Sequence, residues 1–276
     1  GTVQSVANHA FIMSDDSGYT RISSHGCTLP KTGTVIETIC TKVHPLDRNK
    51  ELACLKWNSL GVAPVASPLK LRLDDLDEHR HNLHSVTVEG TVVDLIADEI
   101  DSRYCILLLK DGGTTIPCFA EQSHLPQELQ DARVQLTGTY YHLATGFRRF
   151  SGPFLNVTSK IAVIAPAPDN LLNAPNIDPG DYITPKDIAQ MDRRSLVGTV
   201  LATWGGNQAM LRSENVVVNI VFGHSISLPP CGQTIKVAGY PGTDLYHLVL
   251  SKCVWAPADA SRKNQGDDMA MDVSPR

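Results

Sequence analysis

Residues 140–150 interleave aromatic rings with arginines more densely than any other part of the chain. Aromatic rings stack on nucleobases or sugars, and arginines pair with phosphates, so this composition is typical of oligonucleotide-binding surfaces. A long β-hairpin that packs its aromatics on a neighbour while arginines cover its surface would show the same pattern. Six residues are our candidate ligand-binding residues: Tyr140, Tyr141, Phe147, Arg148, Arg149 and Phe150.

A histidine-rich segment, residues 78–84, raises the question of a metal site. His79 and His81 would lie on one face of an extended segment, but His84 matches neither strand nor helical spacing to both. Acidic residues cluster just before this segment and again at residues 98–101. Neither cluster has the fixed ligand spacing and glycine turn of a calcium loop. The sequence therefore predicts no metal ligands and no cofactor.

Motifs for catalysis are missing from the sequence. Ten histidines and many serines are present, but there is no Gly-x-Ser-x-Gly elbow and no cysteine in a protease-like context. The glycine pairs at 112–113 and 205–206 are followed by neither Gly-Lys-Ser/Thr nor a predicted helix. They favour hairpin turns over a phosphate loop. We expect a protein that is not an enzyme.

Seven cysteines occur, and no two form a Cys-x-x-Cys arrangement, which argues against zinc. Six of the cysteines form three pairs of residues that lie near each other in the sequence, and Cys27 is left over. Each pair could form a disulfide in an oxidising compartment, or equally could remain as reduced thiols that fill the core. The pairs are Cys40 with Cys54, Cys105 with Cys118, and Cys231 with Cys253.

Three landmarks recur in the same order in three places, which indicates an internal repeat. Gly-Thr-Val opens at Gly1, Gly90 and Gly198. Segments with an apolar residue at every second position, typical of half-buried strands, follow at residues 33–40, 131–138 and 232–239. Each copy then closes on an apolar run and Ala-Pro, at Pro64, Pro166 and Pro257.

The middle copy shows the strand order of the unit. We expect strands at about 86–96, 104–109, 114–120, 132–141 and 154–164, with a short non-strand segment at 121–130. A five-stranded Greek-key barrel of the OB type has its excursion between the third and fourth strands. The prediction is an all-β chain of three tandem OB-like five-stranded Greek-key barrels joined by Pro/Asp-rich connectors.

The predicted organisation has six parts, and we expect the first barrel to be trimmed at its N-terminal edge. The parts are barrel 1 at 1–64, a connector at 65–85, barrel 2 at 86–166, a connector at 167–194, barrel 3 at 195–257 and a polar tail at 258–276.

The net charge of the chain limits which partners it can bind. A net charge of −5 and a pI near 6.0 leave no global positive field to attract phosphate backbones, so non-specific nucleic-acid binding is disfavoured. No stretch approaches the roughly 18 apolar residues of a membrane helix. Because the chain begins at Gly1 without Met, we expect a processed or truncated chain whose signal peptide or anchor has been removed.

Several features together resemble a family. They are Leu-x-Leu-Asp-Asp-Leu at 71–76, Val-x-Val-x-Gly-x-Val at 86–92, the Asp-Gly-Gly hairpin at 111–113 and Val-x-Leu-x-Gly at 134–138. This pattern is similar to the tandem OB-like modules in extracytoplasmic regions of bacterial sensor histidine kinases and related envelope proteins. The resemblance implies a periplasmic or cell-envelope segment that senses, spaces or docks.

Three functions follow from the sequence, in descending order. The first is a non-enzymatic extracytoplasmic binding or sensory module, the sensor segment of a signalling protein, with an unidentified ligand or protein partner. The second is binding of single-stranded nucleic acid or oligosaccharide through the loop between the fourth and fifth strands of barrel 2. The third is a structural spacer.

Overall fold

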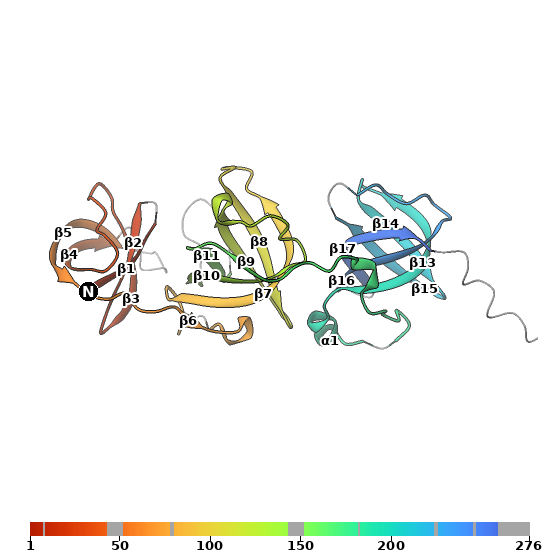
Figure 1. Cartoon of the computed structure of the whole chain (residues 1–276), viewed down its shortest axis with the longest axis horizontal. Helices are drawn as coiled ribbons and strands as arrows, with labels where there is room; N and C mark the ends of the chain where they lie inside the picture. The colour runs from red at the N-terminus through yellow and green to blue at the C-terminus, as the bar shows by residue number, and fades with distance from the viewer. Residues whose placement is uncertain are drawn as a thin grey trace, which may run out of the picture. The chain divides into compact units, whose positions relative to one another are not determined.

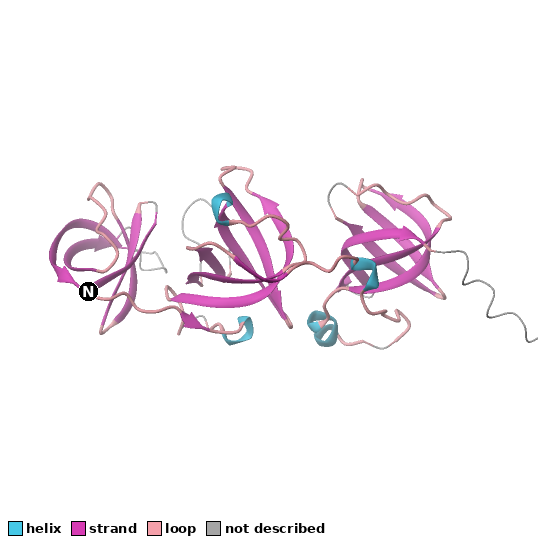
Figure 2. Cartoon of the chain, viewed as in Figure 1, coloured by secondary structure: helices cyan, strands magenta, loops and turns pink. Residues whose placement is uncertain are grey.

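The computed structural model describes residues 1–7, 9–42, 52–77, 80–142, 152–181, 183–223, 226–244 and 247–258. Strands dominate these residues, and the helical elements are short (Figure 2). The chain divides into two compact units, Gly1–Ala167 and Pro168–Arg276. The first unit holds two barrels and the second holds one.

The first barrel consists of β1 (Thr2–Ala7), β2 (Ala10–Asp15), β3 (Gly18–Ser23), β4 (Thr34–Lys42) and β5 (Leu52–Val62). They close in the order β1-β2-β3-β5-β4 (Figure 1). The core is small, because it has only a few fully buried apolar side chains to exclude water. These are Val3, Phe11, Ile22, Ile36 and Cys54.

The middle barrel starts after β6 (Leu69–Lys70) and the turn η1 (Leu73–Asp75). Its strands are β7 (Ser85–Ala97), β8 (Tyr104–Asp111), β9 (Thr114–Glu121), β10 (Arg133–Tyr141) and β11 (Phe154–Val157). The short 3-10 turn η2 (Gln122–His124) lies between β9 and β10, and β12 (Ala162–Ala165) adds to the outside of β10. Pairing of β10 with β7 closes the barrel in the same order as the first.

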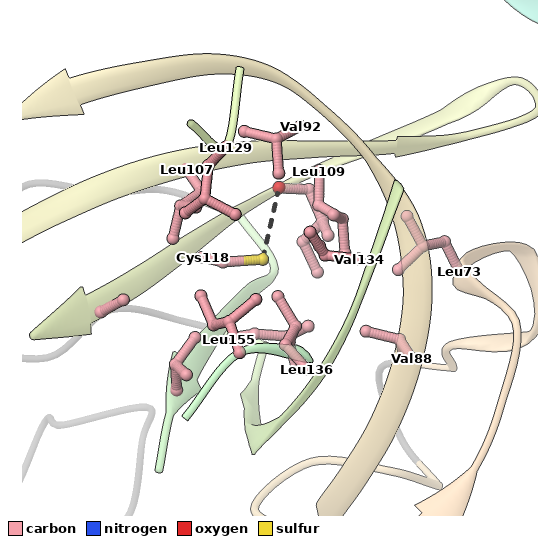
Figure 3. Close-up of a cluster of buried hydrophobic side chains, with 14 of the residues drawn as sticks. Leu73, Val88, Val92, Leu107, Leu109, Cys118, Leu129, Val134, Leu136 and Leu155 are labelled. Carbon is pink, nitrogen blue, oxygen red and sulfur yellow. Dashed lines mark hydrogen bonds between the residues drawn. The ribbon is translucent and has the colours of Figure 1, made fainter. Parts of the chain in front are cut away.

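The core of the middle barrel is the largest of the three. Alternate residues of β7, β8, β9 and β10 point inward and are almost fully buried, as a strand with one buried face requires. In Figure 3, leucines and valines from these strands surround Cys118, whose thiol donates to the Ile116 carbonyl oxygen at 3.7 Å. Leu73 of η1 seals the core from the connector side.

The third barrel follows the turn η3 (Leu171–Asn173) and the helix α1 (Pro185–Gln190). Its strands are β13 (Arg194–Trp204), β14 (Gln208–Ser213), β15 (Val216–Phe222), β16 (Thr234–Asp244) and β17 (His247–Pro257), closed in the order β13-β14-β15-β17-β16. Thr184 caps α1 by accepting from the Asp187 amide. Pro185 occupies the first turn, where its missing N–H is not needed, and the helix ends at Gln190, shortly before β13 begins at Arg194.

The recurrent Gly-Thr-Val has a steric cause. A Cβ atom at Gly90 would lie 2.8 Å from the Lys110 carbonyl oxygen, and one at Gly198 would lie 2.9 Å from that of Arg212. The first strand of each barrel therefore approaches the second too closely for a side chain. Each first strand also has a register shift just beyond this point, at Val3/Ser5, Val92/Asp94 and Val200/Ala202. Such bulges bend a strand so that it can close a barrel.

The prediction of three tandem OB-like barrels is confirmed by these strand orders. The last strand expected at 154–164 is instead two short strands, β11 and β12. β11 pairs with both β9 and β10, whereas β12 pairs with the opposite end of β10. The boundaries drawn between barrels and connectors stay predictions, and residues 259–276 of the expected tail lie outside the described residues. No helix among the described residues is long and apolar enough to cross a membrane.

Candidate functional site

The outer surface of β8 and β9 in the middle barrel carries apolar side chains. Ile106 lies opposite Phe119, and Leu108 lies opposite Pro117. All four are partly exposed, whereas their sequence neighbours Leu107 and Cys118 are buried. The inner residues supply the core, so the outer four are not needed to fill it. In OB folds, this face and the loops beside it hold oligonucleotides and oligosaccharides.

Three aromatic rings extend this surface onto β10 and β11. The Phe154 ring stands edge-on to the Phe119 ring, with centroids 5.2 Å apart and an interplanar angle of 85°. On its other side, Phe154 stacks on Tyr141 at 5.0 Å and 7°. Tyr141 and Phe154 are direct partners in the β10–β11 pairing, which explains their stacking. The rings are partly exposed and form a row across three strands.

A cavity of about 180 Å³ lies beside this row, within the unit Gly1–Ala167. The middle barrel contributes Tyr141, Phe154 and Asn156 to its wall. The rest of the described wall comes from the first barrel and includes one charged residue, Arg21 on β3. Such a cavity is smaller than the usual range of roughly 300–1,000 Å³ for drug-sized ligands, so it fits one small planar group. The residues from the first barrel are Ser5, Ala7, Ala10, Phe11, Ile12 and Arg21.

Arg21 and Tyr141 interact across this cavity. Burial raises the pKa of the Tyr141 hydroxyl, whereas the positive charge of Arg21 and a hydrogen bond with it act in the opposite direction. Burial is the larger effect, so Tyr141 remains a neutral phenol at physiological pH. The site therefore offers aromatic faces, an amide at Asn156 and one guanidinium.

The turn between β7 and β8 borders the outer face. Asp98 organises it by accepting from the amides of Ile100 and Asp101, at 2.9 and 3.4 Å. Arg103 pairs with Asp101 through two nitrogens, at 3.0 and 2.7 Å, and its guanidinium carbon lies 5.7 Å from the centre of the Tyr104 ring. Ile100 projects into solvent at the tip, 83% exposed. The turn thus presents an apolar tip, while its arginine is held in an ion pair.

The structure places only one of the six predicted ligand-binding residues at the cavity. Tyr141 lines the cavity, whereas Tyr140 is only 1% exposed and belongs to the core. Phe147, Arg148, Arg149 and Phe150 lie outside the described residues. Sequence reasoning did not identify Phe119, Phe154, Asn156 or Arg21. For Phe119 a signal existed, because it stands between two small buried residues of a strand and must therefore point outward.

The histidine-rich segment has a packing role where it can be described. The His84 ring lies 3.9 Å from the Tyr19 ring, and His81 Nδ1 accepts from the Asp77 amide at 2.9 Å. His79 lies outside the described residues. Within the described ranges, no group of three or more His, Cys, Asp or Glu side chains is arranged to hold a metal ion.

A second cavity, of about 420 Å³, lies against β6, β7 and β10 of the middle barrel. Its walls carry three cationic and three anionic side chains. Arg133 pairs with Asp111 at 3.3 Å and with Glu89 at 3.8 Å, and Arg72 pairs with Asp75 at 3.3 Å. Because these charges neutralise one another within the wall, the first cavity is the better candidate site.

Comparisons with known proteins give matches of fold at low identity. The asparaginyl-tRNA synthetase of Entamoeba histolytica matches 40% of this chain and 26% of its own, at 17% identity and a TM-score of 0.31. The enzyme from Pyrococcus horikoshii matches 37% of this chain and 24% of its own, at 14% identity and a TM-score of 0.29. The tetrameric p202 HIN2 matches 63% of this chain and 94% of its own, at 10% identity and a TM-score of 0.27.

The chain thus spans about a quarter of the length of these synthetases. No protein-family model matches the chain, and neither does any curated protein. At these identities and TM-scores, the structural matches carry no argument about function.

Proposed function

We propose that the chain is a non-enzymatic binding protein whose middle barrel holds a single-stranded nucleic acid on its outer aromatic face. The observation that carries this proposal is the row of rings formed by Phe119, Phe154 and Tyr141. Stacking on such rings tolerates any base, because every base has a π-face. The row lies on the OB-fold surface that commonly holds oligonucleotides.

The cavity supports the same proposal. One base stacked along Tyr141 or Phe154 would reach the Asn156 amide, which can donate to and accept from a base edge. Arg21 is the cation on the same wall and can pair with a phosphate. Arg148 and Arg149 lie outside the described residues and stay predicted phosphate contacts.

The net charge of −5 sets the expected mode of binding. Without a global positive field, affinity comes mainly from stacking and only a few phosphate contacts. Removal of one phosphate contact changes the slope of log K against log salt by about 0.7 for a single strand. We therefore expect a shallow salt dependence, in contrast to the steep dependence of a basic DNA-binding protein.

The extracytoplasmic location and the sensory role implied by the family resemblance stay predictions. An aromatic row can also stack on sugars, so an oligosaccharide is the ligand class to compare with the nucleic acid. The two classes differ in charge, and the response to salt separates them.

The test is a fluorescence-polarisation titration with a labelled single-stranded oligonucleotide of about 12 nucleotides, within the known site sizes of OB folds. Phe154→Ala should weaken binding about 5- to 150-fold, because a stacked base contributes about 1–3 kcal/mol. Phe154→Leu keeps an apolar side chain without the ring and serves as a control for folding. Absence of binding at low salt, or binding that Phe154→Ala leaves unchanged, would contradict the proposal.

A further inference from the structure

Three cysteines converge in the first barrel. Cys40 on β4 is the direct antiparallel partner of Cys54 on β5. Thr38 Oγ1 lies 3.4 Å from the Sγ atom of each of these two cysteines. Cys27, in the segment between β3 and β4, donates its thiol to the Cys54 carbonyl oxygen at 3.2 Å. Cys54 is part of the small core, and Cys27 and Cys40 pack against that core.

The strand pairing suits a disulfide between Cys40 and Cys54. Direct partners in an antiparallel pair have Cα atoms about 4.5–5.5 Å apart, within the range that a disulfide requires. Burial raises the pKa of the Cys27 thiol, and the hydrogen bond with Cys54 and the charges of the other two thiolates raise it further. The raised pKa lowers the fraction of Cys27 present as thiolate at neutral pH, so its attack on an external disulfide is slow.

The remaining cysteines lack this arrangement. Cys105 lies opposite Ala120 and Cys118 lies opposite Leu107, so these two buried cysteines are offset by two residues. Diagonal neighbours of this kind are about 7–8 Å apart, beyond the usual Cα separation of a disulfide. Cys253 is buried on β17, whereas Cys231 is exposed in the turn before β16.

We propose that Cys27, Cys40 and Cys54 form a thiol–disulfide exchange site that reacts with low-molecular-weight disulfides. Cys54 is the shared thiol of two alternative disulfides, one with Cys27 and one with Cys40. The proposal is independent of the nucleic-acid function.

Exposure sets the order of the steps. Cys54 is 1% exposed, whereas Cys27 and Cys40 are partly exposed, so an external disulfide reaches one of these two first. That thiolate attacks one sulfur of the external disulfide, forms a mixed disulfide and expels a thiolate, which takes up the proton released by the cysteine. The Cys54 thiolate then attacks the protein sulfur of the mixed disulfide and expels the second small thiol, which is protonated in turn.

The net result is two cysteine thiols oxidised to one disulfide and one external disulfide reduced to two thiols. The remaining thiolate can next attack the Cys54 sulfur and displace the first partner. This exchange needs no further oxidant, because one disulfide bond forms as another breaks.

The experiment uses the full chain with Cys231→Ser, which removes the exposed thiol. The folded protein is equilibrated with oxidised glutathione, quenched with acid, alkylated and digested with trypsin. Cleavage after Arg21, Lys31, Lys42, Lys50 and Lys56 places each of the three cysteines on its own peptide. We expect two cross-linked species, Cys27 with Cys54 and Cys40 with Cys54, and none that contains Cys105 or Cys118.

Single variants resolve the roles. Cys27→Ser should leave only the disulfide between Cys40 and Cys54, and Cys40→Ser only that between Cys27 and Cys54. Cys54→Ser should eliminate both and leave glutathione adducts on the other two. Cys105→Ala is the matched control and should change nothing.

Far-UV circular dichroism checks that each variant folds. If Cys54→Ser does not fold, the disulfides mapped in the chain that keeps all three cysteines still test the proposal. Glutathione adducts alone, a predominant disulfide between Cys27 and Cys40, or no reaction in the folded chain would each overturn the proposal.

Discussion

The outer faces of the middle and third barrels share a strand register but differ in chemistry. Val221 occupies the position in β15 that Phe119 occupies in β9, because Ile220 pairs with β17 as Cys118 pairs with β11. By the same pairings, Val249 stands where Phe154 stands. Further along the face, the third barrel has Gln208 for Ile106, Met210 for Leu108, Asn219 for Pro117 and Gly242 for Tyr141.

This difference separates folding from binding. Both barrels keep buried apolar residues at the inward positions, although their sizes differ, as at Cys118 and Ile220. At the outward positions the chemical character changes as well. A closed barrel is thus specified by the inner residues, while the outer ones can vary without loss of the core. In the first barrel the same outer position holds Ser23, and the neighbouring Arg21 lines the cavity instead. One scaffold therefore supports three different surfaces.

The largest expected effect is on the free energy of unfolding, and it compares the cores of the middle and third barrels. Leu109 and Leu211 occupy matching positions in β8 and β14, and both are fully buried. Leu109→Ala and Leu211→Ala should each lower the free energy of unfolding by about 2–5 kcal/mol, because each removes buried apolar volume and leaves a cavity. Urea unfolding followed by tryptophan fluorescence and circular dichroism measures both.

Each substitution should also act on its own compact unit. Leu211→Ala should shift the transition of the unit Pro168–Arg276 and leave that of Gly1–Ala167 in place. A single transition that both substitutions shift equally would show that the two units unfold together and would remove this part of the comparison.

The next effect exchanges one residue between the two faces. Phe119→Val gives the middle barrel the side chain of the third, and it removes the edge-to-face contact with Phe154. A base stacked on the Phe119 ring contributes about 1–3 kcal/mol, so oligonucleotide affinity should fall about 5- to 150-fold. Val221→Ala in the third barrel is the matched control and should leave affinity unchanged in the same titration. An equal loss from both would place the ligand elsewhere.

Much of the fold could be predicted from the sequence. The repeat, the five-strand order and the excursion before β10 all leave local signals, because alternation and turn residues act over a few positions. The same alternation assigns Tyr140 to the core, since it continues the inward series of Val134 and Leu136. Because successive side chains point to opposite faces of a strand, Tyr141 points outward and lines the cavity.

The cavity itself could not be predicted. Arg21 and Tyr141 come from different barrels, and no sequence pattern indicates which residues of one barrel meet those of the other. The pairing of Phe154 with both Phe119 and Tyr141 likewise depends on the β9–β11 and β10–β11 registers. Long-range pairings of this kind leave no signal in a single sequence.

A smaller effect is expected on the salt dependence of oligonucleotide binding. Replacing both Arg148 and Arg149 with Ala should flatten the salt dependence of oligonucleotide binding, by about 0.7 in slope for each arginine–phosphate pair that the substitution removes. This expectation comes from their place in the sequence after Tyr141. Titrations at four salt concentrations measure the slope, with Lys236→Ala of the third barrel as the control. An unchanged slope would assign the phosphate contacts to other cations.

The smallest effect uses the ionisation of Tyr141. Burial raises its pKa above the ordinary value of 10.0, so the folded chain retains this proton at a pH where the unfolded chain has released it. The stabilising contribution is therefore complete below pH 10 and is lost as the pH rises through the folded pKa. Tyr141→Phe should make the unfolding free energy of the unit Gly1–Ala167 fall less steeply above that pH.

Arg21→Ala should act in the opposite direction on the same residue. Arg21 lowers the pKa of Tyr141 against the effect of burial, so its removal should raise that pKa further and make the alkaline loss of stability steeper. Ultraviolet difference titration of the phenol, compared between the unsubstituted chain, Arg21→Lys and Arg21→Ala, measures the shift. Arg21→Lys keeps the positive charge and should lie between the other two. A titration that Arg21→Ala leaves unchanged would show that the guanidinium does not act on the cavity wall, and the phosphate contact proposed for it would then lose its support.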